Sequence, residues 1–182
     1  LTDENVKGDA LENIGFYYNH IEEYQLALNY LRLIDESTLS NRDMCYLQHN
    51  KKLSLIGLKK ITADDSAVFE LIEFCYNNNE FIQGNSLLLE QARYLNQAQK
   101  HAKAVEVLTA QETQILTATF TPHYLMLFSQ LSKAYLGLNQ LDLANQYGEK
   151  ALAQLNADDK SKWALQTYQT LADIAKQQGD FA

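Results

Sequence analysis

A pair of small residues recurs along the chain, and this recurrence limits the possible folds more than any other feature. Aligning the sequence with itself reveals small or apolar residues in pairs twelve positions apart: Gly15 with Ala27, Leu55 with Ala67, Ala92 with Ala104, and Ser132 with Ala144. The alanines of these pairs are 40, 37 and 40 residues apart, and Ala172 follows Ser132 after another 40 residues. Internal periods of this length are typical of helical-repeat proteins, in which each repeat is one supersecondary unit.

The residues around each pair indicate two amphipathic helices per repeat. In the first repeat, Leu11, Gly15 and Tyr18 share one helical face, and Ala27 and Leu31 share another. The chain of 182 residues contains one proline and seven glycines, too few for the many turns of an all-β fold. We therefore expect an all-α chain. The expected helix pairs are 3–20 with 23–36, 42–60 with 65–78, 84–98 with 101–116, and 122–138 with 141–155, followed by 160–178 alone.

Polar residues at three of these boundaries support the helix assignment. The acidic and hydroxyl residues at 64–66 and 158–161 precede apolar periodic runs, as N-capping groups do when they accept the free N–H groups of a first helical turn. Pro122 follows Thr121 at the expected start of another helix, where proline is tolerated.

At these repeated positions the chain resembles the tetratricopeptide repeat (TPR) family, whose motif places a large residue, Leu, Gly and Tyr on one helix and Ala, Phe and Ala on the next. The resemblance implies an α-α superhelix, a TPR-like solenoid of about four and a half antiparallel helix pairs in one domain, 1–182. The implied repeats are 3–36, 42–78, 84–116, 122–155 and an incomplete 160–182.

Three features depart from the family motif. The second repeat has Lys51 where a large apolar residue is expected and Leu55 at the small site, and the fourth has Gly148 where an aromatic residue usually stands. The period also exceeds the usual length of about 34 residues. Longer repeats of this kind resemble those in the input regions of bacterial signalling proteins.

Composition excludes several classes of function. The net charge of -8 and the pI near 4.9 argue against nucleic-acid binding, which needs a basic surface. No apolar run approaches the roughly 18 residues of a membrane span, so we expect a soluble chain. Its compartment stays open: cytoplasmic, or the extracytoplasmic input region of a membrane-anchored protein. Because the sequence lacks an initiator Met and stops within a repeat, we expect a fragment of a longer protein.

The sequence contains no recognisable catalytic motif, and we expect neither an enzyme nor a resident cofactor or metal. One cluster, Cys45 and His49 with Cys75 on the partner helix, has residue types that can bind zinc. The alternative is that both cysteines are ordinary buried residues and His49 is solvated. We expect free thiols, because the assumed helix ends place the two cysteines at depths that differ by roughly 7 Å.

The TPR resemblance also implies a binding face on the first helix of each repeat. The positions three before, one after and four after the small site face the concave side in that family. In the second to fourth repeats they are Lys52, Ile56 and Lys59; Leu89, Arg93 and Asn96; and Ser129, Lys133 and Leu136. In the first and last repeats they are Glu12, Phe16 and Asn19, and Gln169, Asp173 and Lys176.

Four cations of this face, Lys52, Lys59, Arg93 and Lys133, predict a groove for a peptide with acidic groups. The alternative is an ordinary solvated helix face. The lysine–asparagine clamp of chaperone-binding relatives is not supported, because Ile56 stands where asparagine is needed.

We therefore expect a protein or peptide interaction module, acting as the sensory or regulatory input region of a bacterial signalling protein. One alternative is a structural adaptor that oligomerises through its convex face or its open last repeat, for example as a homodimer. That open edge comprises Tyr168, Ala172, Ala175 and Phe181. A second alternative is a small-ligand or metal-binding helical protein built around Cys45, His49 and Cys75.

Overall fold

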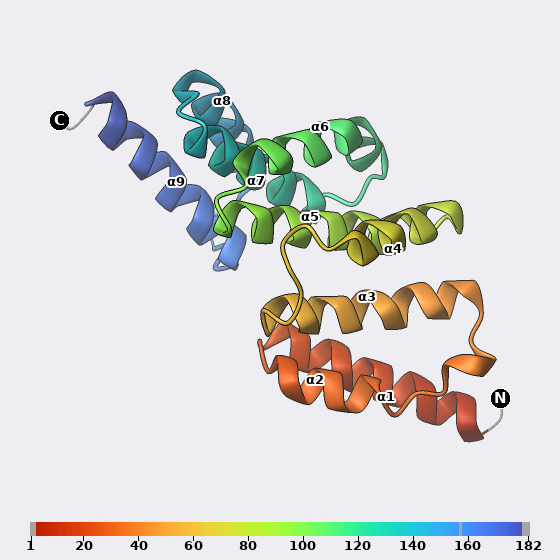
Figure 1. Cartoon of the computed structure of the whole chain (residues 1–182). Helices are drawn as coiled ribbons and strands as arrows, with labels where there is room; N and C mark the ends of the chain where they lie inside the picture. The colour runs from red at the N-terminus through yellow and green to blue at the C-terminus, as the bar shows by residue number, and fades with distance from the viewer. Residues whose placement is uncertain (1–2, 157, 180–182) are drawn as a thin grey trace. The chain divides into compact units, whose positions relative to one another are not determined.

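The computed structural model describes residues 3–156 and 158–179, and over these ranges the chain is all-helical, without a strand, as the sequence predicts. The elements are α1 (Asp3–His20), α2 (Tyr24–Leu31), the short 3-10 helix η1 (Glu36–Thr38), α3 (Asn41–Gly57), α4 (Ser66–Asn77), α5 (Phe81–Gln97), α6 (His101–Thr117), α7 (Pro122–Gly137), α8 (Leu141–Leu152) and α9 (Lys162–Gln178) (Figure 1).

Most helix ends lie close to the positions expected from the sequence, but three helices end earlier than expected. One of them, α8, ends at Leu152 instead of 155. The expected helix 23–36 ends at Leu31, and residues 32–35 form a turn that leads to η1, where the Asp35 side chain accepts hydrogen bonds from the backbone and the hydroxyl of Ser37. The expected helix 42–60 ends at Gly57. Lys59, one residue before the expected end, has left-handed backbone geometry with φ 54°.

The expected caps are confirmed. The side chains of Asp65 and Ser161 accept hydrogen bonds from the first-turn N–H groups of Ala67 and Ala164. Pro122 is the first residue of α7. Ser40 caps α3 by accepting from the backbone N–H of Asp43, and its hydroxyl donates to the Asp43 carboxylate. These side chains satisfy donors that have no partner within the helix.

Five helix C-termini share one turn geometry. Each has a residue with positive φ: Glu22, Lys59, Asn79, Gln99 and Asn139. In each turn the next residue donates its backbone N–H to a carbonyl five positions earlier, as Glu23 does to Tyr18 and Gln140 to Tyr135. This is the Schellman arrangement, which satisfies carbonyls at the end of a helix.

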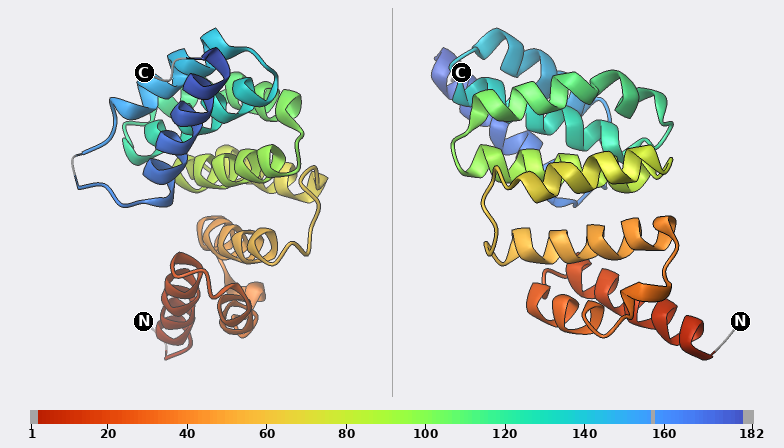
Figure 2. Two further views of the ribbon diagram at one scale, coloured as in Figure 1. Left: turned by 90° about the vertical axis from the view of Figure 1, so that its left-hand side faces the viewer. Right: turned by 45° about the vertical axis from the view of Figure 1, so that its right-hand side comes forward.

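The helices belong to two compact units, residues 1–87 and 88–182, and the division falls within α5. In the first unit, α1 packs against both α2 and α3, and α2 also packs against α3. Figure 2 shows these three elements together at the red-to-orange end of the colour scale. Gly15 marks the crossing of α1 and α2: a Cβ atom placed there would lie 2.5 Å from Cγ of Leu31. The small residue therefore permits the close approach.

A disulfide joins Cys45 of α3 to Cys75 of α4, with the two Cα atoms 5.5 Å apart. The prediction of free thiols was therefore wrong. It assumed that the first helix continued to residue 60, whereas α3 ends at Gly57 and α4 begins at Ser66. With these ends the two depths differ by only about 4–5 Å, less than the roughly 7 Å expected. Both cysteines are fully buried.

In the second unit, α7 packs against α6, α8 and α9, and α8 packs against α9. Ser132 and Ala144 mark the crossing of α7 and α8, where the Ser132 hydroxyl donates to the Ala144 carbonyl at 2.7 Å. Further along this interface Gly148 leaves room for Leu171 of α9. The repeated small sites Gly15, Ala27, Ala92, Ala104, Ser132 and Ala144 are all buried.

The second repeat has a different register from the one expected. Leu55 and Ala67 are only partly buried, whereas their neighbours Ser54 and Val68 are fully buried. Because a shift of one position turns a helix by about 100°, Ser54 occupies the small site that the alignment gave to Leu55.

Candidate functional site

The structure places the predicted binding residues of α3 in different environments. Lys52 is partly buried, and Ile56 is buried. Lys59 is exposed but lies in the turn after α3, so it does not share the helical face of the other two. The predicted set is therefore not a continuous surface in the first unit.

In the second unit most of the predicted binding residues are buried. Leu89 of α5 and Ser129 of α7 are fully buried, and Asn96 and Leu136 are nearly so. Asn96 donates to the backbone carbonyl of Gln130 and to its side-chain oxygen, both at 3.0 Å. These residues hold α5 and α7 side by side and are not exposed contacts for a partner.

The two predicted cations of the second unit are paired within the chain. Arg93 contacts Glu90 at 2.7 Å, and Lys162 of α9 contacts the other oxygen of that carboxylate at 2.8 Å. Lys133 lies 3.8 Å from Asp173. A partner's carboxylate would have to displace these internal acids, so the arrangement does not favour the predicted acidic peptide.

The electrostatics of Glu90 fit a structural role. Burial by itself would raise the pKa of this carboxyl, but Arg93 and Lys162 hold it below its ordinary value. Glu90 therefore stays ionised as the centre of an ion triad between α5 and α9.

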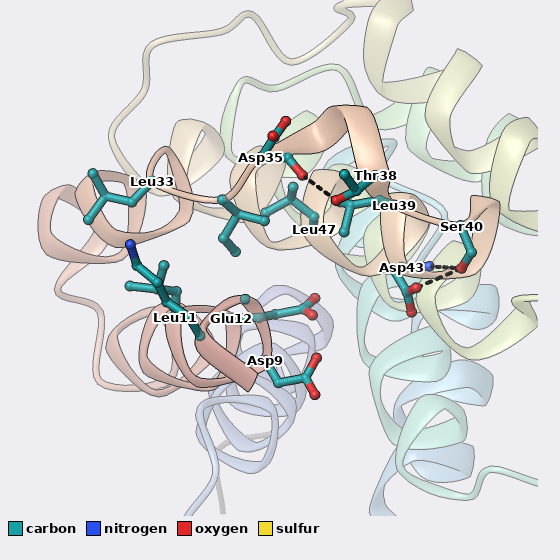
Figure 3. A pocket seen from close by; sticks show the side chains of 13 residues that line it. Asp9, Leu11, Glu12, Leu33, Asp35, Thr38, Leu39, Ser40, Asp43 and Leu47 are labelled. Carbon is teal, nitrogen blue, oxygen red and sulfur yellow. Dashed lines mark hydrogen bonds between the residues drawn. The ribbon is translucent and has the colours of Figure 1, made fainter. Parts of the chain in front are cut away.

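A pocket of about 450 Å³ lies wholly within the first unit, between α1, the segment that follows α2 and the start of α3 (Figure 3). Its apolar wall consists of Leu11, Leu33, Ile34, Leu39 and Leu47, and its charged lining of Lys7, Asp9, Glu12, Asp35 and Asp43. Four carboxylates thus share the pocket with one ammonium group. Figure 3 shows the carboxylates of Asp9 and Glu12 extending from α1 toward the side on which Asp43 lies.

The four carboxylates differ in their hydrogen bonding. Asp35 caps η1, and Asp43 accepts from Ser40 at 2.7 Å. Glu12 has a fully buried oxygen, Oε1, with no hydrogen-bond partner in the described part of the chain. Buried carboxylate oxygens are normally paired, so this atom has unused capacity to accept a hydrogen bond.

Glu12 is also the most perturbed carboxyl of the pocket. Burial, followed by the charges of Asp43 and Asp9, raises its pKa to about 7, although a hydrogen bond from Asn50 opposes the shift. A carboxyl with this pKa exchanges its proton near neutral pH, and a cation bound beside it would restore its ionised form.

Sequence reasoning placed Glu12 on the functional face of α1 but did not find the pocket. The wall formed by Leu33, Ile34 and Leu39 exists only because α2 ends at Leu31. The expected helix 23–36 would have left no such segment. The sequence feature that could have indicated an early end of this helix is the Asp35–Ser37 pair, which forms a local capping turn.

The cysteine and histidine cluster is not a metal site. Cys45 and Cys75 are bonded to each other, so neither provides a thiolate ligand. His49 is nearly buried, and its Nε2 lies 3.1 Å from the Ser86 hydroxyl. Within the described ranges no group of three or more His, Cys, Asp or Glu side chains has a metal-binding arrangement.

The last helix presents an apolar stripe. Leu165 and Tyr168 are 69% and 53% exposed, and Ala172 continues the same face one turn later. Of the other residues predicted for this edge, Ala175 is partly buried and Phe181 lies outside the described residues. The opposite face of α9 is buried through Thr167, Thr170 and Ile174.

None of the helices over 3–156 and 158–179 is long and apolar enough to cross a bilayer. Comparison with protein-family models, with curated proteins and with solved structures finds no match to this chain.

Proposed function

We propose that this chain is a helical-repeat module that binds a protein or peptide partner, and that it serves as the input region of a signalling protein, as its resemblance to TPR proteins implies. The observation that supports binding most directly is a repeated packing order. In the first unit a first helix contacts its own partner and the next first helix: α1 with α2 and α3. In the second unit α7 has the same relation to α8 and α9. In stacked helix pairs of this kind, the side chains between neighbouring helices form the core. The long outer faces of the helices stay exposed and can bind a partner.

The small residues at the crossings support the same proposal. Gly15 against Leu31 and Ser132 against Gly148 occupy corresponding positions in two repeats that lie far apart in the sequence. A shared crossing geometry is typical of repeats that stack, because each pair must present the same surface to its neighbour.

Selection from a library of short random peptides displayed on phage tests the binding function. We expect the purified chain to enrich related peptides that bind with a single site in calorimetry. A helical protein of similar size and charge, selected in parallel, removes sequences that bind any acidic surface. Enrichment no greater than for this control contradicts the proposal.

A second copy of the chain is the alternative partner, and the exposed stripe of Leu165, Tyr168 and Ala172 is the observation that favours it. Light scattering after size-exclusion chromatography separates the two candidates. A dimer that dissociates in the Leu165→Gln/Tyr168→Gln variant supports the adaptor function. A monomer of the wild-type chain at high concentration excludes it.

A further inference from the structure

The pocket of the first unit combines three properties that point to a specific kind of ligand. It encloses about 450 Å³, its charged lining is dominated by carboxylates, and Glu12 Oε1 is buried in it without a donor among the described residues. A buried carboxylate oxygen of this kind can accept a hydrogen bond from a donor-rich group of a ligand.

We propose that this pocket binds the guanidinium group of an arginine side chain presented by a peptide partner, an inference that rests on the proposed interaction function. A guanidinium group has five N–H donors and a permanent positive charge, so it suits a site that offers acceptors and negative charge. The neighbouring carboxylates of Asp9 and Asp43 add to the attraction.

The apolar wall fits the rest of an arginine side chain. Three methylene groups separate the guanidinium from the backbone, and they pack well on aliphatic surfaces such as those of Leu39 and Leu47. A small inorganic cation would leave this wall without a contact. Lys7, which is exposed at the same pocket, balances the charge of only one of the four carboxylates. The lining therefore keeps a net negative charge.

The tripeptide acetyl-Ala-Arg-Ala-amide and its citrulline counterpart test this proposal, because citrulline has nearly the shape of arginine without the charge. Titrations of the whole chain are followed by nuclear magnetic resonance of the backbone amides. We expect the arginine peptide to shift signals of residues around Glu12, Leu39 and Asp43, and the citrulline peptide to bind about tenfold more weakly. Equal binding of both peptides, or shifts that avoid these residues, overturns the proposal.

The matched variants are Glu12→Gln in the pocket and Glu149→Gln on the exposed surface of α8. Both remove one negative charge from a glutamate of the same chain. We expect Glu12→Gln to reduce the preference for arginine over citrulline and Glu149→Gln to leave it unchanged. If Glu12→Gln proves to be unfolded, Asp9→Asn replaces it. A preference for arginine that is as strong in Glu12→Gln as in Glu149→Gln places the site elsewhere.

The pH dependence gives an independent readout. Lys7 and Asp9 from α1, Asp35 before η1 and Asp43 from α3 are the charged groups that face Glu12 in the pocket. Burial and the two nearest acids raise the pKa of Glu12 to about 7, so its carboxylate becomes available as the pH rises through neutrality. We expect binding of the arginine peptide to strengthen from about pH 6 to pH 8 in the wild-type chain and to stay constant in Glu12→Gln.

The peptide selection described above distinguishes failure of this inference from failure of the interaction function. If selected peptides bind but lack arginine and leave the pocket signals unshifted, the pocket proposal fails and the interaction function stands. If neither selected peptides nor the arginine tripeptide bind, both fail.

Discussion

Each unit contains a glutamate that faces a helix interface, and the pKa values of the two carboxyls shift in opposite directions. Glu90 in the second unit is nearly buried, yet Arg93 and Lys162 lower its pKa. Glu12 in the first unit is less buried, no cation of the described residues lowers its pKa, and burial with two nearby acids raises that pKa to about 7. The presence of a cationic partner, more than the depth of burial, therefore decides the state of such a carboxylate. With a partner it is an ion pair of the fold, and without one it can bind a cation from outside.

The same contrast extends to how each unit is held together. The second unit relies on close helix crossings and the Glu90 ion triad. The first unit has a weak match to the repeat motif at α3 and α4, and there a disulfide joins the two helices. Covalent bonding and repeat packing therefore serve the same purpose in different parts of the chain.

The largest expected effect comes from removing the disulfide. Cys45 and Cys75 are 30 residues apart in the sequence, and closing a loop of that length stabilises a protein by about 3–4 kcal/mol. We expect the Cys45→Ala/Cys75→Ala variant to lower the free energy of unfolding of the first unit by about this amount, measured by urea titration with hydrogen exchange. Reductant should destabilise the wild-type chain and leave the variant unchanged. If thiols of the denatured chain react before any reductant is added, the disulfide is absent and the expectation is wrong.

The next effect concerns the ion triad. Arg93→Glu removes one cation from buried Glu90 and adds a like charge, so we expect the second unit to lose about 2–3 kcal/mol of stability. Lys133→Glu makes the same charge change at the looser, more exposed contact with Asp173 and should cost less than about 1 kcal/mol. Fluorescence of Trp163, which lies in α9, reports unfolding of this unit. Equal effects of the two substitutions would show that the triad is not structural.

Acid should affect the two units in opposite directions. His123 of α7 is buried without a partner for Nδ1 among the described residues, and burial lowers its pKa to about 4. Its folded pKa is below the ordinary 6.5, so its contribution is present above that pH and is lost as the pH falls toward 4. We expect the second unit to lose about 2 kcal/mol over this range.

For Glu12 the sign is reversed, because its folded pKa of about 7 is above the ordinary 4.5. Its contribution is present below pH 4.5 and is lost as the pH rises through 7. Hydrogen exchange of α1–α3 and of α7–α9, measured from pH 4 to 8, separates the two trends. His123→Gln and Glu12→Gln should flatten the dependence of their own units only, and a common trend in both would contradict the assignment.

The smallest effect should be the same in both units. Glu22 and Gln99 occupy left-handed turns with φ 63° and 59°, which glycine adopts without strain. We expect Glu22→Gly and Gln99→Gly each to stabilise the chain by about 0.5–1 kcal/mol, measured as an increase in Tm. Asn139→Gly is the control and should change little, because asparagine tolerates this geometry. A loss of stability in the first two variants would show that their side chains have a further role.

The all-helical class and most helix positions were predictable because helical periodicity is local. The caps at Asp65 and Ser161 and the start at Pro122 can be read from neighbouring residues, and the buried small sites follow from the repeat. The early end of α2 at Leu31 was missed, since no glycine or proline marks it. The candidate site was less predictable, because the pairing of Lys162 with Glu90 and the pocket around Glu12 depend on contacts between segments that are distant in the sequence.

The five shared turns also bear on the order in which this chain gains its structure. Each turn closes with a hydrogen bond that spans only five positions, as between Glu23 and Tyr18, so a helical hairpin needs no distant contact to reverse its direction. Hairpins of this kind form in microseconds, whereas pairing of thiols takes seconds or longer. Helical ellipticity should therefore recover well before Cys45 and Cys75 are linked, and the last event in oxidative refolding should be the locking of α3 to α4.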